Sequence, residues 1–213
     1  MKQKLYGLYA ITDEKLMPVN NFNLMAETVL RAGVRIIQYR DKSTDKAKRL
    51  KQATELRRLC TEFGATFIIN DDIELTLQSN ADGIHIGKDD ASIIETRQLL
   101  GDDKIIGVSC YNDATLAETA IKNGADYIAF GSFFGSSIKP DAPKATPDLI
   151  RFIKNKYHTP VCCIGGITTE NCNELLKEQA DMLAVISDIF SSPQQNVIQN
   201  KCSQFSAVFK RTG

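Results

Sequence analysis

The segment TFIINDDIELTLQSNADGIHIGKDD, residues 66–90, decides the fold of this chain. It contains two short apolar runs, 66–69 and 83–86, and each is typical of a strand. A short stretch with helical character, 73–78, lies between them. A strand, a helix and a second strand in this order predict two parallel strands joined by a crossover helix. Both strands end in acidic residues, so these carboxylates are expected side by side.

The same alternation continues along the whole chain. Strands are expected at residues 5–11, 35–39, 66–69, 83–86, 105–109, 127–130, 161–164 and 182–186. Helices are expected at 22–31, 44–63, 73–78, 91–100, 113–122, from 147 onward, at 171–178 and from 193 onward. Small residues before every second strand, as in Asn80-Ala81-Asp82-Gly83, form a weak repeat. The pattern predicts an α/β protein with one domain over residues 1–213, a single (β/α)8 TIM barrel. An open doubly wound sheet is the alternative.

Composition excludes several classes of function. The 213 residues include 26 basic and 26 acidic side chains, so no global field favours nucleic acid or an anionic membrane. There is neither an apolar signal segment nor a run of membrane-spanning length, so a cytoplasmic protein is expected. The six cysteines form no Cys-x-x-Cys pair, which argues against zinc. We interpret them as reduced residues in apolar surroundings.

Asp71 and Asp90 are the candidate metal ligands. Each follows one of the two neighbouring strands of the opening segment. Hard oxygen ligands at adjacent strand ends suit Mg²⁺ when phosphate oxygens complete its shell. The alternative is that Asp72 and Asp90 only cap the following helices, which leaves Asn70 and Asp71 unexplained.

The active site of such a barrel lies at the carboxyl ends of its strands. Around the two carboxylates the strand ends supply amides, cations, hydroxyls and a glycine: Gln38, Arg40, Lys42, Asn70, Ser109, Ser136, Lys139, Gly166 and Ser187. Gly165-Gly166 and Ser187 match the usual phosphate site of a barrel, although a Gly-Gly pair is also a common turn. The set suits a metal-bound pyrophosphate. The alternatives are solvated loops, helix N-terminal turns and, for His85, a packed and hydrogen-bonded side chain.

The chain resembles thiamine phosphate synthase over nearly its full length. The matching motifs are Leu-Tyr-Ala-Ile-Thr-Asp (8–13), Gln-Tyr-Arg-Asp-Lys (38–42), Asn-Asp-Asp (70–72), Ala-Asp-Gly-Ile-His-Ile-Gly-Lys-Asp-Asp (81–90), Gly-Val-Ser (107–109), Ile-Gly-Gly-Ile (164–167) and Val-Ile-Ser (185–187). The family is a (β/α)8 barrel that joins hydroxymethylpyrimidine pyrophosphate to a thiazole phosphate. Pyrophosphate leaves first, and the thiazole nitrogen then captures a pyrimidine cation.

The resemblance implies roles for individual residues. Asp71 and Asp90 are expected to bind Mg²⁺. The expected catalytic residues are Arg40, Lys42, Ser109 and Lys139. The expected substrate contacts are Gln38, Tyr39, Arg40, Asp41, Lys42, Asn70, Ser109, Ser136, Ser137, Ile138, Lys139, Gly166, Ile186 and Ser187. The partners are then small-molecule substrates, and association into a homo-oligomer is left open.

The chain departs from the family pattern in three segments. The family motif Thr-x-Thr-Lys is replaced by Ser136-Ser137-Ile138-Lys139, so Ile138 is expected to weaken thiazole phosphate binding. Tyr111 replaces a histidine or other polar residue, and Lys88-Asp89 replaces Gln-Glu. The competing functions are thiazole tautomerase, which carries a histidine where this chain has Ser132, and a non-catalytic phosphate-binding paralogue.

Overall fold

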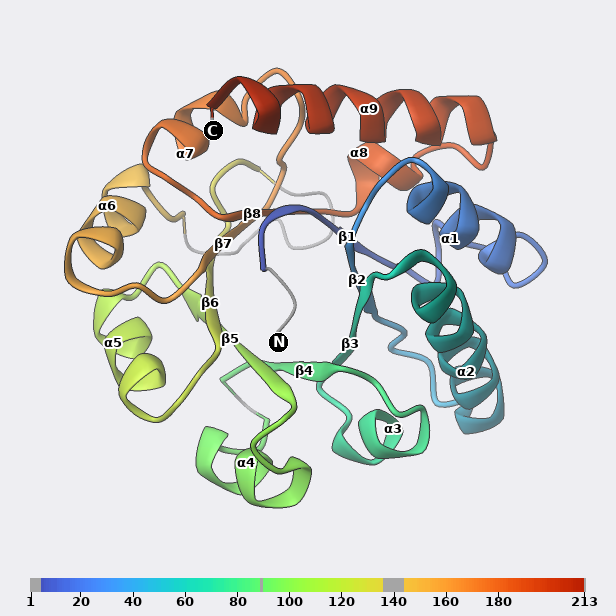
Figure 1. Ribbon diagram of the computed structural model, residues 1–213, viewed down its shortest axis with the longest axis horizontal. Helices are drawn as coiled ribbons and strands as arrows, with labels where there is room; N and C mark the ends of the chain where they lie inside the picture. Colours follow the sequence, from blue (N-terminus) through green and yellow to red (C-terminus); the bar gives the residue numbers. More distant parts are fainter. Residues whose placement is uncertain (1–4, 89, 136–143, 213) are drawn as a thin grey trace.

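Eight parallel strands pair in chain order and close into a barrel, because β1 pairs with β8 as well as with β2 (Figure 1). The computed structural model describes residues 5–88, 90–135 and 144–212. The strands are β1 (Gly7–Ile11), β2 (Ile36–Tyr39), β3 (Thr66–Asn70), β4 (Gly83–Ile86), β5 (Ile105–Tyr111), β6 (Tyr127–Phe130), β7 (Val161–Ile164) and β8 (Met182–Val185). The predicted TIM barrel is confirmed, and the open doubly wound sheet is excluded.

Helices surround this barrel as an outer ring (Figure 1). They are α1 (Phe22–Arg31), α2 (Lys46–Phe63), α3 (Ile73–Gln78), α4 (Ile93–Leu100), α5 (Ala114–Lys122), α6 (Pro147–Lys156), α7 (Asn173–Lys177), α8 (Ser187–Phe190) and α9 (Gln195–Thr212). The expected helices are found in the expected order, with small shifts at their ends, and α8 is an additional short helix that the sequence did not predict. Strand β5 runs two residues further than expected, to Tyr111, where its pairing with β6 changes register.

Local capping explains several of these boundaries. The carboxylate of Asp113 accepts the amides of Thr115 and Leu116, which satisfies free donors of the first turn of α5. Helix α6 begins at Pro147, where the fixed φ of proline suits the first turn. Gly64 ends α2 in a left-handed conformation, with φ of 61°, which a residue without Cβ adopts readily.

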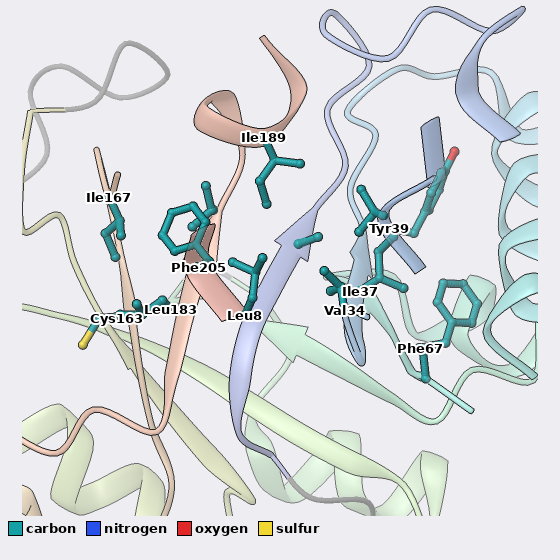
Figure 2. Packing of buried hydrophobic residues seen from close by; sticks show 14 of the residues in the cluster. Leu8, Val34, Ile37, Tyr39, Phe67, Cys163, Ile167, Leu183, Ile189 and Phe205 are labelled. Carbon is teal, nitrogen blue, oxygen red and sulfur yellow. The ribbon is translucent and has the colours of Figure 1, made fainter. Parts of the chain in front are cut away.

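Two apolar cores flank the strands. The outer core lies between strands and helices and includes Leu8, Ile37, Phe67 and Phe205 (Figure 2). The inner core fills the barrel and contains Tyr9, Ile11, Ile36, Ile68, Ile105, Tyr127, Ala129, Cys162, Met182 and Ala184. Successive side chains of a strand point to opposite faces, so every strand except β4 contributes to both cores. The barrel is therefore packed rather than hollow.

The repeat before the even-numbered strands has a physical basis at the amino-terminal face of the barrel. Three aspartates each accept the backbone N–H of a residue at the start of the preceding odd strand and pair with a cation from the helix before that strand. The three sets are Asp82 with Phe67 N and Arg57, Asp126 with Ile106 N and Arg97, and Asp181 with Val161 N and Lys154. We call these three sets the aspartate clamps. Each clamp ties two neighbouring strands to one helix.

The fold also bears on the predictions about the cysteines and about membrane-spanning segments. All six cysteines are buried with free thiols. Burial raises the pKa of the Cys60, Cys110 and Cys202 thiols to about 12. Among the described residues, no helix is long and apolar enough to cross a membrane.

Candidate active site

Asp71 and Asp90 lie together at the carboxyl ends of β3 and β4. The two carboxyl groups are close enough to interact, since Asp71 raises the pKa of Asp90. Asp71 also accepts Nδ2 of Asn70 (2.6 Å) and pairs with the ammonium group of Lys42. The backbone N–H of Gly87 donates to Oδ2 of Asp90 (2.6 Å). The structure thus brings together the predicted carboxylate pair, the predicted amide and one predicted cation.

The neighbourhood of the two carboxylates affects their protonation. Asp90 is exposed as a residue, yet partial burial of its carboxyl group and the adjacent Asp71 raise its pKa, while Gly87 and Lys42 oppose the rise. Like charges this close disfavour double ionisation unless a cation lies between them. Two adjacent carboxylates plus an amide oxygen therefore fit a divalent cation such as Mg²⁺. In the described part of the chain, no group of three or more His, Cys, Asp or Glu side chains is arranged to hold a metal by itself.

The alternative that Asp72 and Asp90 only cap the following helices holds for Asp72 and not for Asp90. Asp72 caps α3 by accepting the N–H of Leu75 (2.8 Å), and it also pairs with Arg49. Helix α4 is instead capped by Ser92, which leaves Asp90 free of that role.

Arg40 and Lys42 point to different acidic partners. The hydroxyl of Thr12 on the β1 side accepts the N–H of Arg40 (2.8 Å) and donates to its carbonyl (3.1 Å). The guanidinium lies 3.6 Å from Asp13 and 4.0 Å from Glu14. Lys42 reaches across to Asp71 on the next strand end. The two cations therefore stand on either side of the β2 end.

Tyr39 and Asp41 are turned toward α2. The Tyr39 side chain belongs to the outer core (Figure 2), and its hydroxyl donates to Oε1 of Gln52 (2.9 Å). Asp41 is buried, pairs with Lys48 (2.6 Å) and accepts the N–H of Ser43 (2.8 Å). These contacts shape the loop after β2, and a direct substrate contact by either side chain stays a prediction.

The predicted phosphate site, formed by Gly165-Gly166 and Ser187, lies at the ends of β7 and β8, which pair with each other. Gly165 and Gly166 have φ values of 107° and 61°, in the left-handed region that favours glycine. A Cβ on Gly166 would lie 2.3 Å from the carbonyl oxygen of Gly135. Ile186 and Ser187 form the start of α8 directly after β8. Gly166, Ile186 and Ser187 are therefore brought to one corner. The other predicted phosphate contacts, Ser136, Ser137, Ile138 and Lys139, lie outside the described residues.

The last group of predicted residues points into the barrel. Nδ1 of His85 contacts the hydroxyl of Tyr127 (2.9 Å), and Nε2 contacts Oγ of Ser109 (2.8 Å). Its ring stacks on that of Tyr127, with centroids 5.5 Å apart. Burial lowers the pKa of His85 to about 4, so the ring is neutral near pH 7. The packed, hydrogen-bonded histidine is therefore confirmed.

Sequence reasoning missed Tyr9 and Tyr127, which lie at the centre of this polar group. Gln38 donates its amide N–H to the hydroxyl of Tyr9 (2.8 Å), so it is engaged inside the barrel. Two features of the sequence could have indicated them: Tyr127 stands at an inward position of its strand, and Gly107 stands opposite it on β5. A Cβ on Gly107 would lie 2.0 Å from the Tyr127 ring, so this glycine makes room for the tyrosine.

Comparison with known proteins identifies relatives of this chain. The family model for thiamine monophosphate synthase matches residues 8–189. The chain is 42% identical to the thiamine-phosphate synthase of Marinobacter nauticus, over 96% of this chain and 91% of that protein. It is 44% identical to the thiamine-phosphate synthase of Alcanivorax borkumensis, over 97% of this chain and 95% of that one. Among solved structures, a thiamine phosphate pyrophosphorylase from Pyrococcus furiosus superposes with a TM-score of 0.87 at 30% identity, covering 98% of both chains.

Proposed function

The chain belongs to the thiamine monophosphate synthase family, and from this membership we propose that it joins hydroxymethylpyrimidine pyrophosphate to hydroxyethylthiazole phosphate. The products are thiamine phosphate and pyrophosphate. The enzyme is a transferase, since the pyrimidinylmethyl group moves from pyrophosphate to the thiazole nitrogen. The observation that supports this reaction most strongly is the Asp71–Asp90 carboxylate pair with Lys42 and Asn70 beside it.

Asp71 and Asp90 are the residues that hold Mg²⁺ in this proposal. When bound, Mg²⁺ neutralises charge on the pyrophosphate and makes it a better leaving group. Asn70 orients the carboxylate of Asp71 by donating an N–H to it. Lys42 is close enough to pair with the same carboxylate, and it can turn its ammonium group to a pyrophosphate oxygen.

The chain's other polar groups act on the departing pyrophosphate and on the incoming thiazole. The methylene–oxygen bond of the pyrimidine substrate breaks first, and its electron pair leaves with the pyrophosphate. Arg40, Lys42 and Lys139 stabilise the charge that develops there, which preorganised cations do without reorganisation. The thiazole nitrogen then donates its lone pair to the methylene carbon. No proton is removed from either substrate, so no strong general base is needed.

The phosphate of the thiazole substrate is assigned to the corner at the ends of β7 and β8. Gly166 and Ile186 offer backbone groups there, and Ser187 offers a hydroxyl as well. Gly166 is held in place because Nδ2 of Asn171 donates to its carbonyl (2.9 Å). Ser136, Ser137 and Ile138 are proposed to border the same phosphate.

The test is turnover by the purified protein with both substrates and Mg²⁺. We expect equimolar thiamine phosphate and pyrophosphate, and we expect loss of both when the ion is chelated. Absence of product with both substrates present would overturn the proposal and leave a tautomerase or a phosphate-binding paralogue. The tautomerase is disfavoured because Ser132, which stands where that enzyme has a histidine, donates its hydroxyl to the carbonyl of Phe134 (2.6 Å).

A cytoplasmic location and a possible homo-oligomer belong to the same proposal. Both substrates are small phosphorylated molecules, and neither nucleic acid nor a membrane enters the reaction. Fractionation of cells and light scattering of the purified protein test these two points.

A further inference from the structure

A chain of hydrogen bonds crosses the interior of the barrel, linking side chains of β2, β1, β6, β4 and β5. Gln38 Nε2 donates to the Tyr9 hydroxyl (2.8 Å), and the Tyr9 hydroxyl lies 2.9 Å from that of Tyr127. The Tyr127 hydroxyl contacts His85 Nδ1 (2.9 Å), and His85 Nε2 contacts Ser109 Oγ (2.8 Å). Gln38, Tyr9 and Tyr127 are at most 2% exposed, so these groups are shielded from bulk water.

The donors and acceptors of this chain follow from its first bond. The Tyr9 oxygen accepts from Gln38, and each tyrosine hydroxyl has one hydrogen to donate. Tyr9 therefore donates to Tyr127, and Tyr127 in turn donates to Nδ1 of His85. The hydrogen of the neutral imidazole then resides on Nε2, which donates to Ser109 Oγ. In this direction each of the four hydrogen bonds has one donor and one acceptor.

With the Gln38 amide oriented so that Nε2 faces Tyr9, other arrangements leave a buried hydrogen without an acceptor. If Nδ1 of His85 carried a hydrogen, Tyr127 would accept it and would donate its own hydrogen to Tyr9. Tyr9 would then have no acceptor among the described residues, because its only partners there are Gln38 and Tyr127. The same conflict arises for a doubly protonated imidazole. Buried polar groups without a partner are rare and destabilising.

We propose that His85 is a positioning residue, fixed as the Nε2–H tautomer by Tyr9 and Tyr127, and that it sets the hydroxyl of Ser109 as a hydrogen-bond donor to bound substrate. The proposal rests on the function proposed above, because Ser109 is one of its substrate contacts. With His85 donating to its oxygen, Ser109 has its own hydrogen free. Ser109 is half-buried, unlike the tyrosines, so this hydrogen can reach a ligand at the strand ends.

The first test measures the tautomer directly and needs no substrate. The chain contains only two histidines, His85 and His158, so ¹⁵N-labelled imidazoles give a simple spectrum. The exposed His158 is removed by His158→Gln, which assigns the signals. We expect His85 to carry its hydrogen on Nε2 at neutral pH. In Tyr127→Phe, which keeps the stacked ring, we expect a mixture of tautomers. A hydrogen on Nδ1 in the parent protein would overturn the proposal.

The second test asks whether Tyr127 acts through Ser109. We expect Tyr127→Phe to lower kcat/KM for the pyrimidine pyrophosphate about tenfold, the size of one lost hydrogen bond. In a Ser109→Ala background the same change should cost less than about twofold, because coupled residues are not additive. Equal losses in both backgrounds would mean a structural role and would overturn the proposal.

A third test separates the effect of the Nε2–H donor of His85 from the effect of packing by its ring. His85→Gln keeps an N–H near the position of Nε2, whereas His85→Leu removes it. We expect His85→Gln to retain several times more kcat/KM than His85→Leu at similar melting temperature. Equal losses would contradict the donor role. An inactive parent protein that still shows the Nε2–H tautomer would reject the proposed function and leave the hydrogen-bond chain standing.

Discussion

Asp71 adopts a left-handed backbone conformation, with φ of 62°, directly after β3. This region is sparsely populated by non-glycine residues, although aspartate tolerates it better than most. The amide of Asp71 donates to the carbonyl of His85 on the neighbouring strand (2.9 Å), and the amide of Asp72 donates to the carbonyl of Asn70 (2.8 Å). The chain thus turns sharply at the strand end. The turn separates the two adjacent acids, so that Asp71 meets Asp90 while Asp72 caps α3.

This separation predicts different effects for neighbouring substitutions. Asp71→Asn and Asp90→Asn each remove one carboxylate of the pair, so the Mg²⁺ concentration for half-maximal activity should rise about 10- to 100-fold. Asp72→Asn is the matched control, because asparagine caps helices as well as aspartate does. Its Mg²⁺ requirement should stay within about twofold of the parent. An equal shift in all three variants would show that the carboxylate pair is not the metal site.

The low pKa of His85 predicts that the stability of the protein depends on pH. Burial lowers its pKa to about 4 in the folded protein, against an ordinary value near 6.5. Between these pH values the unfolded chain binds a proton that the folded protein does not bind, so the free energy of unfolding falls as pH falls. The slope from one histidine is at most about 1.4 kcal/mol per pH unit. Urea unfolding at pH 7, 6 and 5 should show a shallower fall for His85→Gln than for the parent.

The control for this measurement is His158→Gln. His158 is exposed in the loop before β7, so its removal should leave the pH slope unchanged. If the parent and His85→Gln lose stability in parallel, the low pKa of His85 does not contribute to folding.

Ile138 carries a prediction from sequence alone, since it lies outside the described residues. Ile138→Thr restores the hydroxyl of the family pattern and should lower KM for the thiazole phosphate. A lost hydrogen bond to a charged group is worth about 1.5–3 kcal/mol, so the change is at most about 10- to 100-fold. The turnover number should change little, because a contact equal in ground and transition states affects binding alone. An unchanged KM would mean that position 138 does not face the phosphate.

At the scale of elements, the aspartate clamps join the parallel strands in pairs. In the most buried clamp, Asp126 accepts the N–H of Ile106 (2.9 Å) and the guanidinium of Arg97 (2.7 Å). Arg97 also donates to the carbonyls of Lys104 (2.5 Å) and Gly124 (3.2 Å). One arginine of α4 therefore orders the turns before both β5 and β6. Before β2 the corresponding position is Arg35, whose guanidinium donates to the carbonyls of Leu30 and Val34. Among the described residues, β1 and β2 are therefore not joined by an aspartate clamp.

The clamp predicts a large stability loss from a residue remote from the site. Asp126→Ala removes the acceptor of the Ile106 N–H and the carboxylate partner of the Arg97 guanidinium, so unfolding should become easier by about 2–3 kcal/mol. The control is Asp148→Ala, whose pair with Arg151 is exposed and should contribute less than about 0.5 kcal/mol. Denaturant titration of both variants checks the difference. Comparable effects would mean that the clamp is no stronger than a surface ion pair.

At the scale of the whole molecule, α9 closes the ring of helices beside α1 (Figure 1). Its residues Ile198, Cys202, Phe205 and Phe209 are buried in the outer core, which continues around the barrel. The family match ends at residue 189, before this helix begins. The last helix is therefore part of the same core as the strands that carry the site.

Substitution of Phe205 tests whether α9 and the barrel share one core. It is fully buried, so Phe205→Ala should reduce the free energy of unfolding by about 3–5 kcal/mol in a single transition. Phe152→Ala is the matched control, because that ring is 45% exposed on α6 and should cost less than about 1 kcal/mol. Separate unfolding transitions for α9 and for the barrel would contradict one continuous core.

The sequence by itself determined the order of the strands and of all helices except α8, their approximate ends and the residues at the strand ends. It could do so because apolar periodicity, caps and turn residues are local signals, as Asp113, Pro147 and Gly64 illustrate. It also predicted that Asp71 and Asp90 would meet, since consecutive parallel strands place their ends together.

Only the tertiary structure decided what depends on partners far apart in the chain. Tyr9 and Tyr127 are 118 residues apart, and no local pattern predicts that their hydroxyls meet inside the barrel. The outward turn of Tyr39 and Asp41, and the pairing of Arg40 with Asp13, likewise depend on which helix or strand lies beside them. Barrel closure brings β1 against β8 and the tyrosine of β6 against that of β1. The hydrogen-bond chain that orients Ser109 is therefore a consequence of closure.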